Sequence, residues 1–303
     1  MNAETTFEAD QTEVDSSSTG CAHDDPFDFE TEPAVALHCL SHTYPDGTTG
    51  VHDVSFAVHA GETVGLIGGN GAGKSTLMEH LNGLVDVQAG ELHVEGERIT
   101  DANIDLARRS VGFVFQDADS QIVAPTVIDD VMFGVLNYGA DQTEARNRAQ
   151  AALERLDAGH LADRVPHHLS GGEKRLVAIA GVLAMEPNVI VMDEPLAGLD
   201  PAREQQVRSV IETLQDDDIG LVVATHDVDF AATISDRIVV MTDGNIVGSG
   251  PPSSVFYDDA LLDRANLRPP TPTRLARELG VADSRPVTEA ELLERLDGTD
   301  STP

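Results

Sequence analysis

The sequence predicts an α/β protein built on a parallel β-sheet. A glycine-rich loop at 68–75 (GGNGAGKS) follows one apolar run and precedes a segment of helical character. Three further apolar runs, at 189–192, 221–224 and 238–241, are bounded by polar or turn residues and leave room for helices between them. Such short runs are typical of parallel strands buried on both faces. The active groups are therefore expected at the carboxyl ends of the strands.

The glycine-rich loop has the pattern of a P-loop. Its glycines let the backbone curl so that several N–H groups point inward, and such donors at the start of a helix form a cradle for phosphate oxygens. Lys74 is expected to reach the β- and γ-phosphates of a nucleotide, and Ser75 to place its hydroxyl on Mg²⁺. A glycine-rich turn could match by chance, but the strand before it and the helix after it favour nucleotide binding. The residues predicted to hold the nucleotide here are Gly68, Gly69, Asn70, Gly71, Ala72, Gly73, Lys74, Ser75 and Thr76.

The composition indicates a globular protein with a very acidic surface. The 303 residues are 41% apolar, enough for one large domain or two smaller ones. The net charge is −34, and the only lysines are Lys74 and Lys174, both inside motifs. This pattern is typical of proteins from a salt-rich (halophilic) cytoplasm, where a Debye length of about 3 Å at 1 M salt screens self-repulsion. A field of this sign argues against nucleic acid and against direct adsorption to anionic lipid.

The beginning of the chain is expected to be a tail. Residues 1–32 are rich in acids, contain no Lys or Arg and include a Ser/Thr tract, which is typical of a disordered acidic extension. The first residues lack the basic and apolar regions of a signal peptide, and no run of eighteen apolar residues occurs. We therefore expect a protein of the cytoplasmic side that does not itself span a bilayer.

The cysteines and nearby histidines are predicted not to form a metal site. Cys21, His23, His38, Cys39 and His42 match no zinc spacing, and neighbouring residues of a strand point to opposite faces. Because Cys21 falls in the predicted tail, reduced cysteines are the simpler expectation.

Antiparallel strands are expected beside the glycine-rich loop. Alternating and apolar runs at 35–40 and 54–58, separated by a turn, are followed by a β-rich piece at 91–99. Tyr44 lies at the turn, just before a proline. From its position alone it is equally a candidate for stacking on a base and an ordinary turn aromatic.

Two helical regions complete the chain. Residues from about 117 to 185 change to a helical pattern, with a long helix opening at 170 and running to about 185, where a proline at 187 stops it. Beyond 252 a small helical region at 253–303 contains Thr271-Pro272, expected to be an N-cap followed by a first-turn proline, and a capping box at Thr288.

Two adjacent carboxylates follow the apolar run at 189–192. Asp193 is suited to orienting Mg²⁺ and its waters, and Glu194 to polarising a water for in-line attack on a γ-phosphate. In so acidic a chain they could be a solvated pair, but their place at the end of a buried strand and before Pro195 favours function.

Several motifs, in this order, resemble those of an ATP-binding cassette (ABC) ATPase over residues 33–252. They are the P-loop, Gln116 at a strand end, Leu169-Ser170-Gly171-Gly172-Glu173, Asp193-Glu194, Ala197-Gly198-Leu199-Asp200 and Thr225-His226-Asp227. The resemblance implies a P-loop NTPase core with a parallel sheet, an antiparallel β subdomain and a helical subdomain at about 117–185. It also implies that ATP and Mg²⁺ are the cofactors.

The resemblance assigns roles to residues that the chain alone leaves open. Ser170, Gly171 and Gly172 would contact the γ-phosphate held by the opposite subunit, which suits free N–H groups at the start of a helix. Two copies, or this chain and a second ABC ATPase, would then share two composite sites. Gln116 would sense Mg²⁺ and the attacking water, and His226 the γ-phosphate. Asp200 would belong to a loop crossing the interface, and the resemblance favours base stacking for Tyr44.

The segment after Gln116 is similar to that of energy-coupling-factor importers, in particular the cobalt or nickel branch. That resemblance implies an ATPase subunit held at the cytoplasmic face of the membrane by a transmembrane scaffold, with a separate membrane subunit that binds the substrate. Asp129 or Asp130 is expected to receive a basic element of the scaffold. The alternatives are a soluble ABC ATPase of DNA repair or translation, and a binding-only protein. No long heptad insertion or basic stripe supports the former, and Lys74, Glu194 and His226 argue against the latter.

Overall fold

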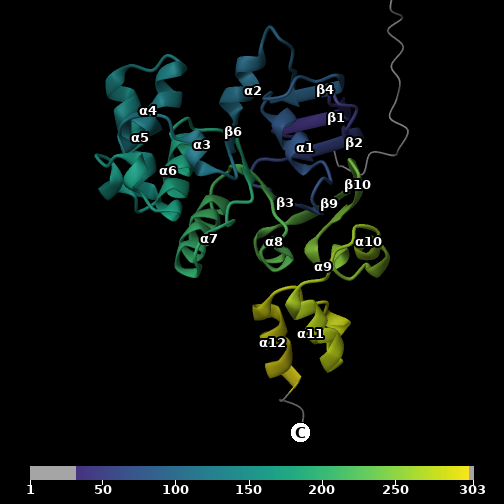
Figure 1. The fold of residues 1–303 in the computed structure, drawn as a ribbon. Coiled ribbons are helices and arrows are strands. Elements are labelled where there is room, and N and C mark those ends of the chain that lie inside the picture. The colour runs from purple at the N-terminus through teal and green to yellow at the C-terminus, as the bar shows by residue number, and fades with distance from the viewer. Residues whose placement is uncertain (1–31, 300–303) are drawn as a thin grey trace, which may run out of the picture.

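A six-stranded sheet forms the centre of the protein, whose computed structural model describes residues 32–299 (Figure 1). Its order is β10-β9-β3-β8-β7-β6, and neighbouring strands are parallel except β10, which is antiparallel to β9. The three apolar runs are β7, β8 and β9, so the predicted parallel strands are confirmed. The strands are β3 (Thr63–Gly68), β6 (Val111–Val114), β7 (Val189–Asp193), β8 (Gly220–Ala224), β9 (Arg237–Thr242) and β10 (Asn245–Gly250).

A second, four-stranded antiparallel sheet lies above the first, in the order β2-β1-β4-β5. It confirms the expected antiparallel strands, although its second strand begins earlier than predicted. The amide of His52 in β2 donates a hydrogen bond of 2.9 Å to the carbonyl of Gly244, beside β10, so the two sheets are joined next to the glycine-rich loop. The strands are β1 (Val35–Thr43), β2 (Thr49–Val58), β4 (Ala89–Val94) and β5 (Glu97–Arg98).

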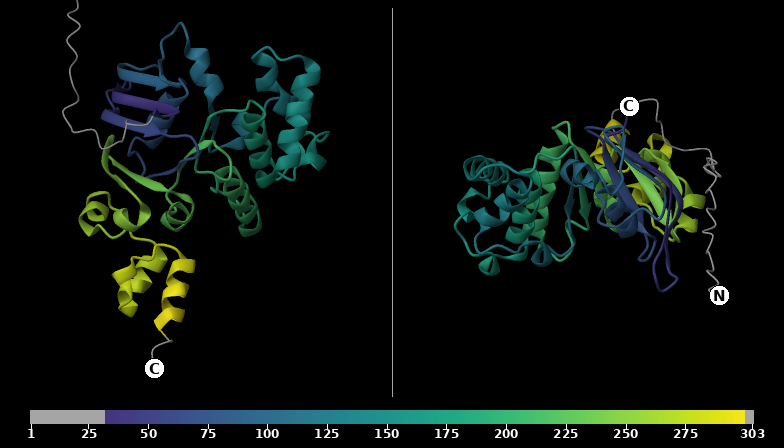
Figure 2. Two further views of the ribbon diagram at one scale, coloured as in Figure 1. Left: turned by 180° about the vertical axis from the view of Figure 1, so that it is seen from behind. Right: turned by 90° about the horizontal axis from the view of Figure 1, so that it is seen from above.

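The helices fall into three groups along the chain, and Figure 2 shows the second (teal) as a lobe to one side. The first group packs on or between the sheets: α1 (Lys74–Leu81), α2 (Ile104–Ser110), α7 (Pro201–Gln215) and α8 (Val228–Ile234). The second forms a lobe to one side: α3 (Ala118–Gln121), α4 (Val127–Asn137), α5 (Gln142–Arg155) and α6 (Gly171–Leu183). The third contains α9 (Pro252–Val255), α10 (Asp259–Arg264), α11 (Thr271–Leu279) and α12 (Glu289–Thr299). Helix α2 was not predicted from the sequence.

The core follows from the alternation of side chains along each buried strand. In β7, Ile190 and Met192 belong to the cluster that contains the buried faces of α4 to α7. Val189 and Val191 belong instead to the cluster formed with α1 and the antiparallel sheet. One strand thus connects both halves of the molecule and carries Asp193 at its exposed end.

Helix caps agree with the sequence at two helices and differ at a third. Ser170 and Glu173 form a capping box at α6, and Thr288 and Glu291 bond reciprocally at α12. Thr271, however, is the first residue of α11 rather than its N-cap, which is Pro270. Its amide donates to Asp229 Oδ1 at 2.6 Å, so Thr271 ties α11 to α8 instead of capping its own helix.

Two further sequence expectations concern the ends and the cysteines. The predicted acidic extension lies, apart from its last residue, outside the described residues. Cys39 is disulfide-bonded, which differs from the expectation of reduced cysteines, and its partner lies outside the described residues. Among residues 32–299, no helix is both long and apolar enough to cross a membrane, and no group of three or more His, Cys, Asp or Glu side chains is placed to hold a metal ion.

We predict that the packing beneath the glycine-rich loop contributes strongly to stability. Leu77 of α1 is completely buried, so Leu77→Ala is expected to lower the free energy of unfolding by about 2–5 kcal/mol. Leu84, just beyond the same helix, is 49% exposed, and Leu84→Ala is expected to change that free energy by less than about 1 kcal/mol. Denaturant unfolding in high salt tests both, and equal losses would contradict the assigned packing.

Candidate active site

A cleft of about 540 Å³ opens at the carboxyl ends of β3, β7 and β8. It gathers residues from five separate stretches of the chain. Four of them follow parallel strands of the central sheet, and the fifth is the turn between β1 and β2. The lining residues are Tyr44, Thr48, Thr49, Gly50, Asn70, Gly71, Ala72, Gly73, Lys74, Ser75, Thr76, Gln116, Asp193, Glu194 and His226. The structure thus brings together most of the predicted site residues. Gly68 and Gly69 lie in the loop but not on the cleft wall.

The glycine-rich loop depends on backbone freedom at Gly73. This residue has φ +98°, and a Cβ there would lie 2.3 Å from the carbonyl oxygen of Gly50. Lys74 Nζ donates to the carbonyl oxygens of Gly68 (2.8 Å) and Gly69 (3.2 Å). Partial burial lowers the pKa of Lys74, opposed by the charges of Glu194 and Asp193. The loop therefore holds a cation at the start of α1, where an anion is favoured.

Ser75 and Asp193 place two oxygen ligands side by side. The Ser75 hydroxyl donates to Asp193 Oδ2 at 3.1 Å. Burial raises the pKa of the Asp193 carboxyl, the Ser75 hydrogen bond opposes that rise, and the neighbouring charge of Glu194 adds to it. Hydroxyl and carboxylate oxygens are ligands that Mg²⁺ prefers, so this donor set fits the predicted magnesium ion. The roles remain predictions.

Glu194 is held by two neighbours from the end of β8. Both of its carboxylate oxygens lie 2.9 Å from Nδ1 of His226, and the Thr225 hydroxyl donates to Oε2 at 3.3 Å. The Glu194 side chain is only 14% exposed. Its backbone has φ +46°, a left-handed conformation that is uncommon for a non-glycine residue and clusters at functional sites. A carboxylate that is held in one orientation on a strained backbone can act as a general base.

Tyr44 forms one wall of the cleft and is fixed by two contacts. Its hydroxyl lies 2.9 Å from Thr76 Oγ1, and its ring meets the His42 ring edge-on at 4.8 Å. A Cβ at Gly50 would lie 2.7 Å from the Thr76 side chain and 3.0 Å from the Tyr44 ring, so only glycine fits between them. Gly50 and its neighbours Thr48 and Thr49 line the cleft but were not among the predicted site residues. The Gly50 position carried no signal until the fold placed it against Thr76.

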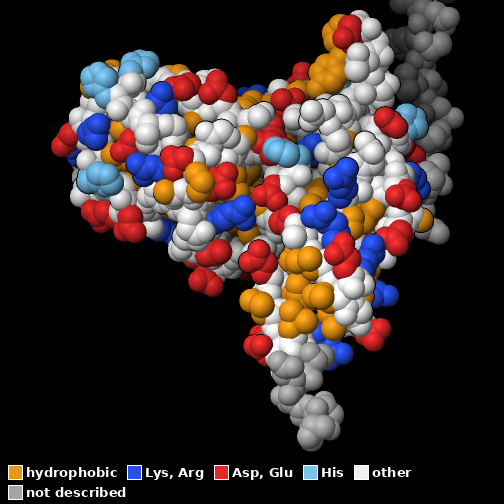
Figure 3. Space-filling view, turned by 60° about the horizontal axis from the view of Figure 1, so that its bottom comes forward, with side chains coloured by type: hydrophobic (Ala, Val, Ile, Leu, Met, Phe, Trp, Pro, Cys, Tyr) orange, Lys and Arg blue, Asp and Glu red, His pale blue; other side chains and the backbone are white. Residues whose placement is uncertain are grey.

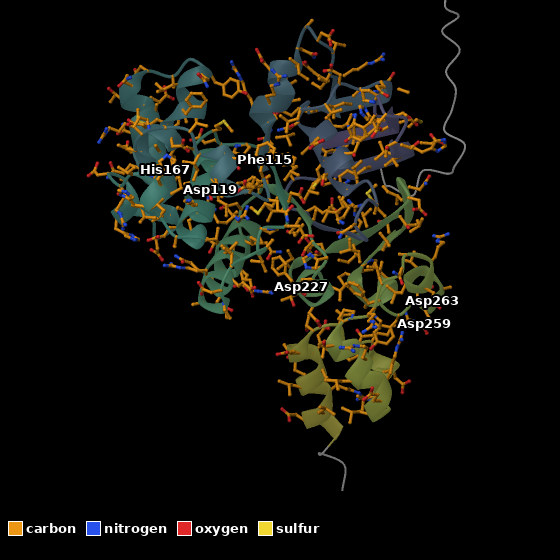
Figure 4. All side chains as sticks on the ribbon, in the orientation of Figure 1. Phe115, Asp119, His167, Asp227, Asp259 and Asp263 are labelled. Carbon is orange, nitrogen blue, oxygen red and sulfur yellow. The ribbon has the colours of Figure 1, made fainter. Side chains whose placement is uncertain are left out.

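The loop that carries Gln116 is fixed by a buried arginine. Arg175 of α6, 3% exposed, donates to the carbonyl oxygen of Gln116 at 2.5 Å and to that of Phe115. The next contact outward pairs Lys174 with Asp119, which Figure 4 shows beside Phe115. Arg175 was not among the predicted site residues, although a cation directly before the apolar run of α6 was a usable signal.

The predicted contacts to a second subunit lie outside the cleft. Ser170 stands at the N-cap of α6, where Glu173 Oε2 accepts the Ser170 amide at 2.7 Å, and these bonds with Ser170 lower the pKa of Glu173. Gly171 and Gly172 form the first turn of α6. Asp200 caps α7 by accepting from the amides of residues 202 and 203. None of these residues lines the cleft of its own chain.

Comparison with known proteins decides the family. The family model described as "ABC transporter" matches residues 51–197. The energy-coupling factor transporter ATP-binding protein EcfA of Methanothermobacter thermautotrophicus is 41% identical over 250 residues, covering 82% of this chain and 80% of that protein. The cobalt import ATP-binding protein CbiO of Rhodobacter capsulatus is 43% identical over 265 residues, covering 87% and 94%. The chain belongs to the ABC transporter ATPase family.

Solved structures of this family confirm the fold of the ABC ATPase. CbiO1 of Clostridium perfringens, described as part of the ABC transporter complex CbiONQ, matches with a TM-score of 0.69 and 35% identity, covering 82% of this chain and all of that one. The cassette MJ0796, in a dimeric post-hydrolysis state bound to ADP and Pi, matches with a TM-score of 0.64 and 28% identity, covering 72% and 98%. The α/β fold predicted from the sequence is therefore correct.

We predict that the ionised carboxylate of Asp193 destabilises the folded protein near neutral pH. Because burial raises its pKa, the folded protein binds the proton more tightly than the unfolded chain, and stability is lost as pH rises from the ordinary pKa through the raised one. Asp193→Asn, which can still accept from Ser75, is expected to raise the melting temperature near pH 7 and to lose turnover. The gain in melting temperature should shrink as the pH falls towards about 4.

The exposed Asp200→Asn is the matched control, since asparagine also caps a helix. Its melting temperature should equal that of the wild type. A destabilised Asp193→Asn at neutral pH would contradict this prediction.

Proposed function

We propose that this ABC ATPase is the energy-coupling subunit of an energy-coupling-factor importer for cobalt, nickel or a vitamin. The observation that carries the proposal is the cleft at the strand ends, in which Lys74, Asp193, Glu194 and His226 converge. Relatives named EcfA and CbiO, more than 40% identical over most of their length, support the importer branch. A protein that only binds ATP is disfavoured, because the cleft holds the Lys74 cation together with the carboxylates and the histidine expected for hydrolysis.

The residues of the cleft divide the work of hydrolysis. Lys74, held at two loop carbonyls, can exchange these contacts for β- and γ-phosphate oxygens. Glu194 takes a proton from the water that attacks the γ-phosphate, and His226 keeps that carboxylate oriented. Mg²⁺, held by Ser75 and Asp193 with Gln116 beside it, would neutralise charge on the phosphates. Tyr44 would stack on the base.

Dimerisation follows from where the remaining predicted ligands lie. Ser170, Gly171, Gly172 and Asp200 are outside their own cleft, so they are available to complete the cleft of a partner cassette. The start of α6 would present its free N–H groups and positive dipole end to the γ-phosphate. The partner is either a second copy of this chain or a related ATPase, as in the dimeric cassette MJ0796.

We further propose that the protein is peripheral on the cytoplasmic face of the membrane, held by a transmembrane scaffold beside a substrate-binding membrane subunit. The named complex of CbiO1 supports this arrangement. Soluble ABC ATPases of DNA repair or translation are disfavoured by these relatives and by the net charge of −34, which would repel nucleic acid. The acids spread over the surface (Figure 3) suit a halophilic cell. On the same resemblance we propose that the ATP-binding domain spans residues 33–252, with its helical subdomain at about 117–185, and that residues 253–303 form a small helical region.

The scaffold contact is expected near the start of α4. Asp130 Oδ1 accepts from the amides of Val123 (2.8 Å) and Ala124 (2.9 Å), and Asp129 accepts from a hydroxyl of its own turn. Reversing the charge of Asp130 would therefore disturb this loop itself. The side chains of Val123 and Phe133 are 70% and 53% exposed, and we propose that they take the apolar part of the contact.

We predict that Glu194→Gln lowers ATP turnover by about 10² to 10⁴, the contribution of a positioned base. Glutamine keeps the shape of the side chain but cannot accept the proton. ATP-dependent dimerisation should persist. Turnover is measured by phosphate release and dimerisation by light scattering. Unchanged turnover would remove Glu194 from its role, whereas ATP enclosed in a monomer would remove the composite site.

We predict that Phe133→Ala weakens co-purification with the scaffold and leaves the ATPase activity of the isolated subunit unchanged. The reason is that Phe133 is exposed and lies outside the cleft. Leu84→Ala, an exposed apolar residue of another part of the chain, is the control. The measurement is pull-down from membranes in which the neighbouring genes are co-expressed, and equal recovery of both variants would contradict the proposal.

A further inference from the structure

An arginine behind the cleft links two of its elements. Arg208 of α7 donates from Nη2 to Asp227 Oδ2 at 3.2 Å. Its guanidinium carbon also lies 4.3 Å from the centre of the Phe230 ring, which is completely buried. A charged hydrogen bond and a cation–π contact together fix the head of this side chain against the start of α8.

Asp227 directly follows His226 and is held by hydrogen bonds from both its side chain and its amide. Its Oδ1 caps α8 by accepting the Phe230 amide at 3.0 Å, and its own amide donates to the Thr225 hydroxyl at 3.1 Å. That same hydroxyl donates to Glu194. Figure 4 shows Asp227 at the beginning of α8, below the sheet. The peptide that carries His226 is therefore held between two anchored residues, and any shift of Asp227 changes where the imidazole meets Glu194.

Arg208 reaches this anchor from the helix whose first residues face the expected partner. Asp200 is the N-cap of α7, and Arg208 lies about two turns further along the same helix. A displacement of α7 upon dimer closure would be carried to Asp227 through a short, continuous set of contacts. This is a physical route between the interface and the group that orients the general base.

We propose that Arg208 is a positioning residue for His226 and acts through Asp227. The inference rests on the role given above to His226. Arg208 does not line the cleft, so it is expected to affect the orientation of the Glu194–His226 pair and not the binding of ATP. An ion pair of this exposure contributes little to folding stability, and its value here is geometric.

The test compares Arg208→Gln, Asp227→Asn and the double variant in steady-state ATP hydrolysis. Arg208 borders an open cavity of about 440 Å³, so a glutamine there is solvated and folding is preserved. Asparagine at 227 keeps the N-cap and removes only the charge. Each single change is expected to lower kcat roughly 3- to 30-fold, the range for residues that couple sites, with KM for ATP unchanged. The double variant should lose no more than the worse single variant.

The decisive measurement repeats Arg208→Gln in a His226→Ala background by single-turnover kinetics, which detects slow hydrolysis. If Arg208 acts through His226, the change should then alter the rate less than about twofold. Arg148→Gln removes an arginine paired with Glu144 and Glu186, far from these contacts in the helical lobe, and is the control that should keep wild-type kinetics.

Three results would overturn the proposal: wild-type kcat in Arg208→Gln, with or without a raised KM, losses that multiply in the double variant, or an undiminished effect in the His226→Ala background. Wild-type turnover of His226→Ala alone would instead remove the role of His226, so the two failures are distinguishable.

Discussion

The parallel pairing of β3, β7 and β8 is the constraint on which the rest of the structure depends. Because β3 pairs in parallel with β8, and β8 with β7, the three strands end at one edge of the sheet. The glycine-rich loop, Asp193-Glu194 and His226 follow these ends directly. Residues separated by more than a hundred positions thereby share one cleft without any long side chain reaching across the molecule.

Charge in the cleft is arranged at the expense of stability. Burial opposes ionisation at both Lys74 and Asp193. The Ser75 hydrogen bond at Asp193 and the attraction between the Lys74 cation and the carboxylates oppose that effect. The strained φ of Glu194 adds to the cost. The apolar clusters on both faces of the sheet supply the stability that allows such a site. The residues proposed to act on ATP therefore lie where solvation and backbone preferences are least satisfied.

Local patterns in the sequence were sufficient for the elements that carry motifs. The apolar runs of β7 to β9, the Gly-rich loop, the start of α6 at Ser170 and the capping box at Thr288 each have a cause within a few residues. Thr271 was misjudged because its hydroxyl and amide find Asp229, a partner 42 positions away, rather than its own helix. Gly50 was missed for the same reason, because its contacts with Thr76 and Tyr44 form only after folding. Arg175 differs, since a cation directly before an apolar run was visible in the sequence, although its carbonyl partners were not.

The bond between Tyr44 and Thr76 has a consequence for which nucleotides the cassette accepts. Because the Tyr44 hydroxyl is hydrogen-bonded to Thr76 of α1, only the flat face of the ring is left to contact a base. A face attracts any aromatic heterocycle to a similar degree, since stacking does not read the pattern of groups on the edge of a base. If Tyr44 stacks on the base, the cassette should discriminate only weakly between nucleoside triphosphates. Their relative concentrations in the cell would then decide which of them it hydrolyses.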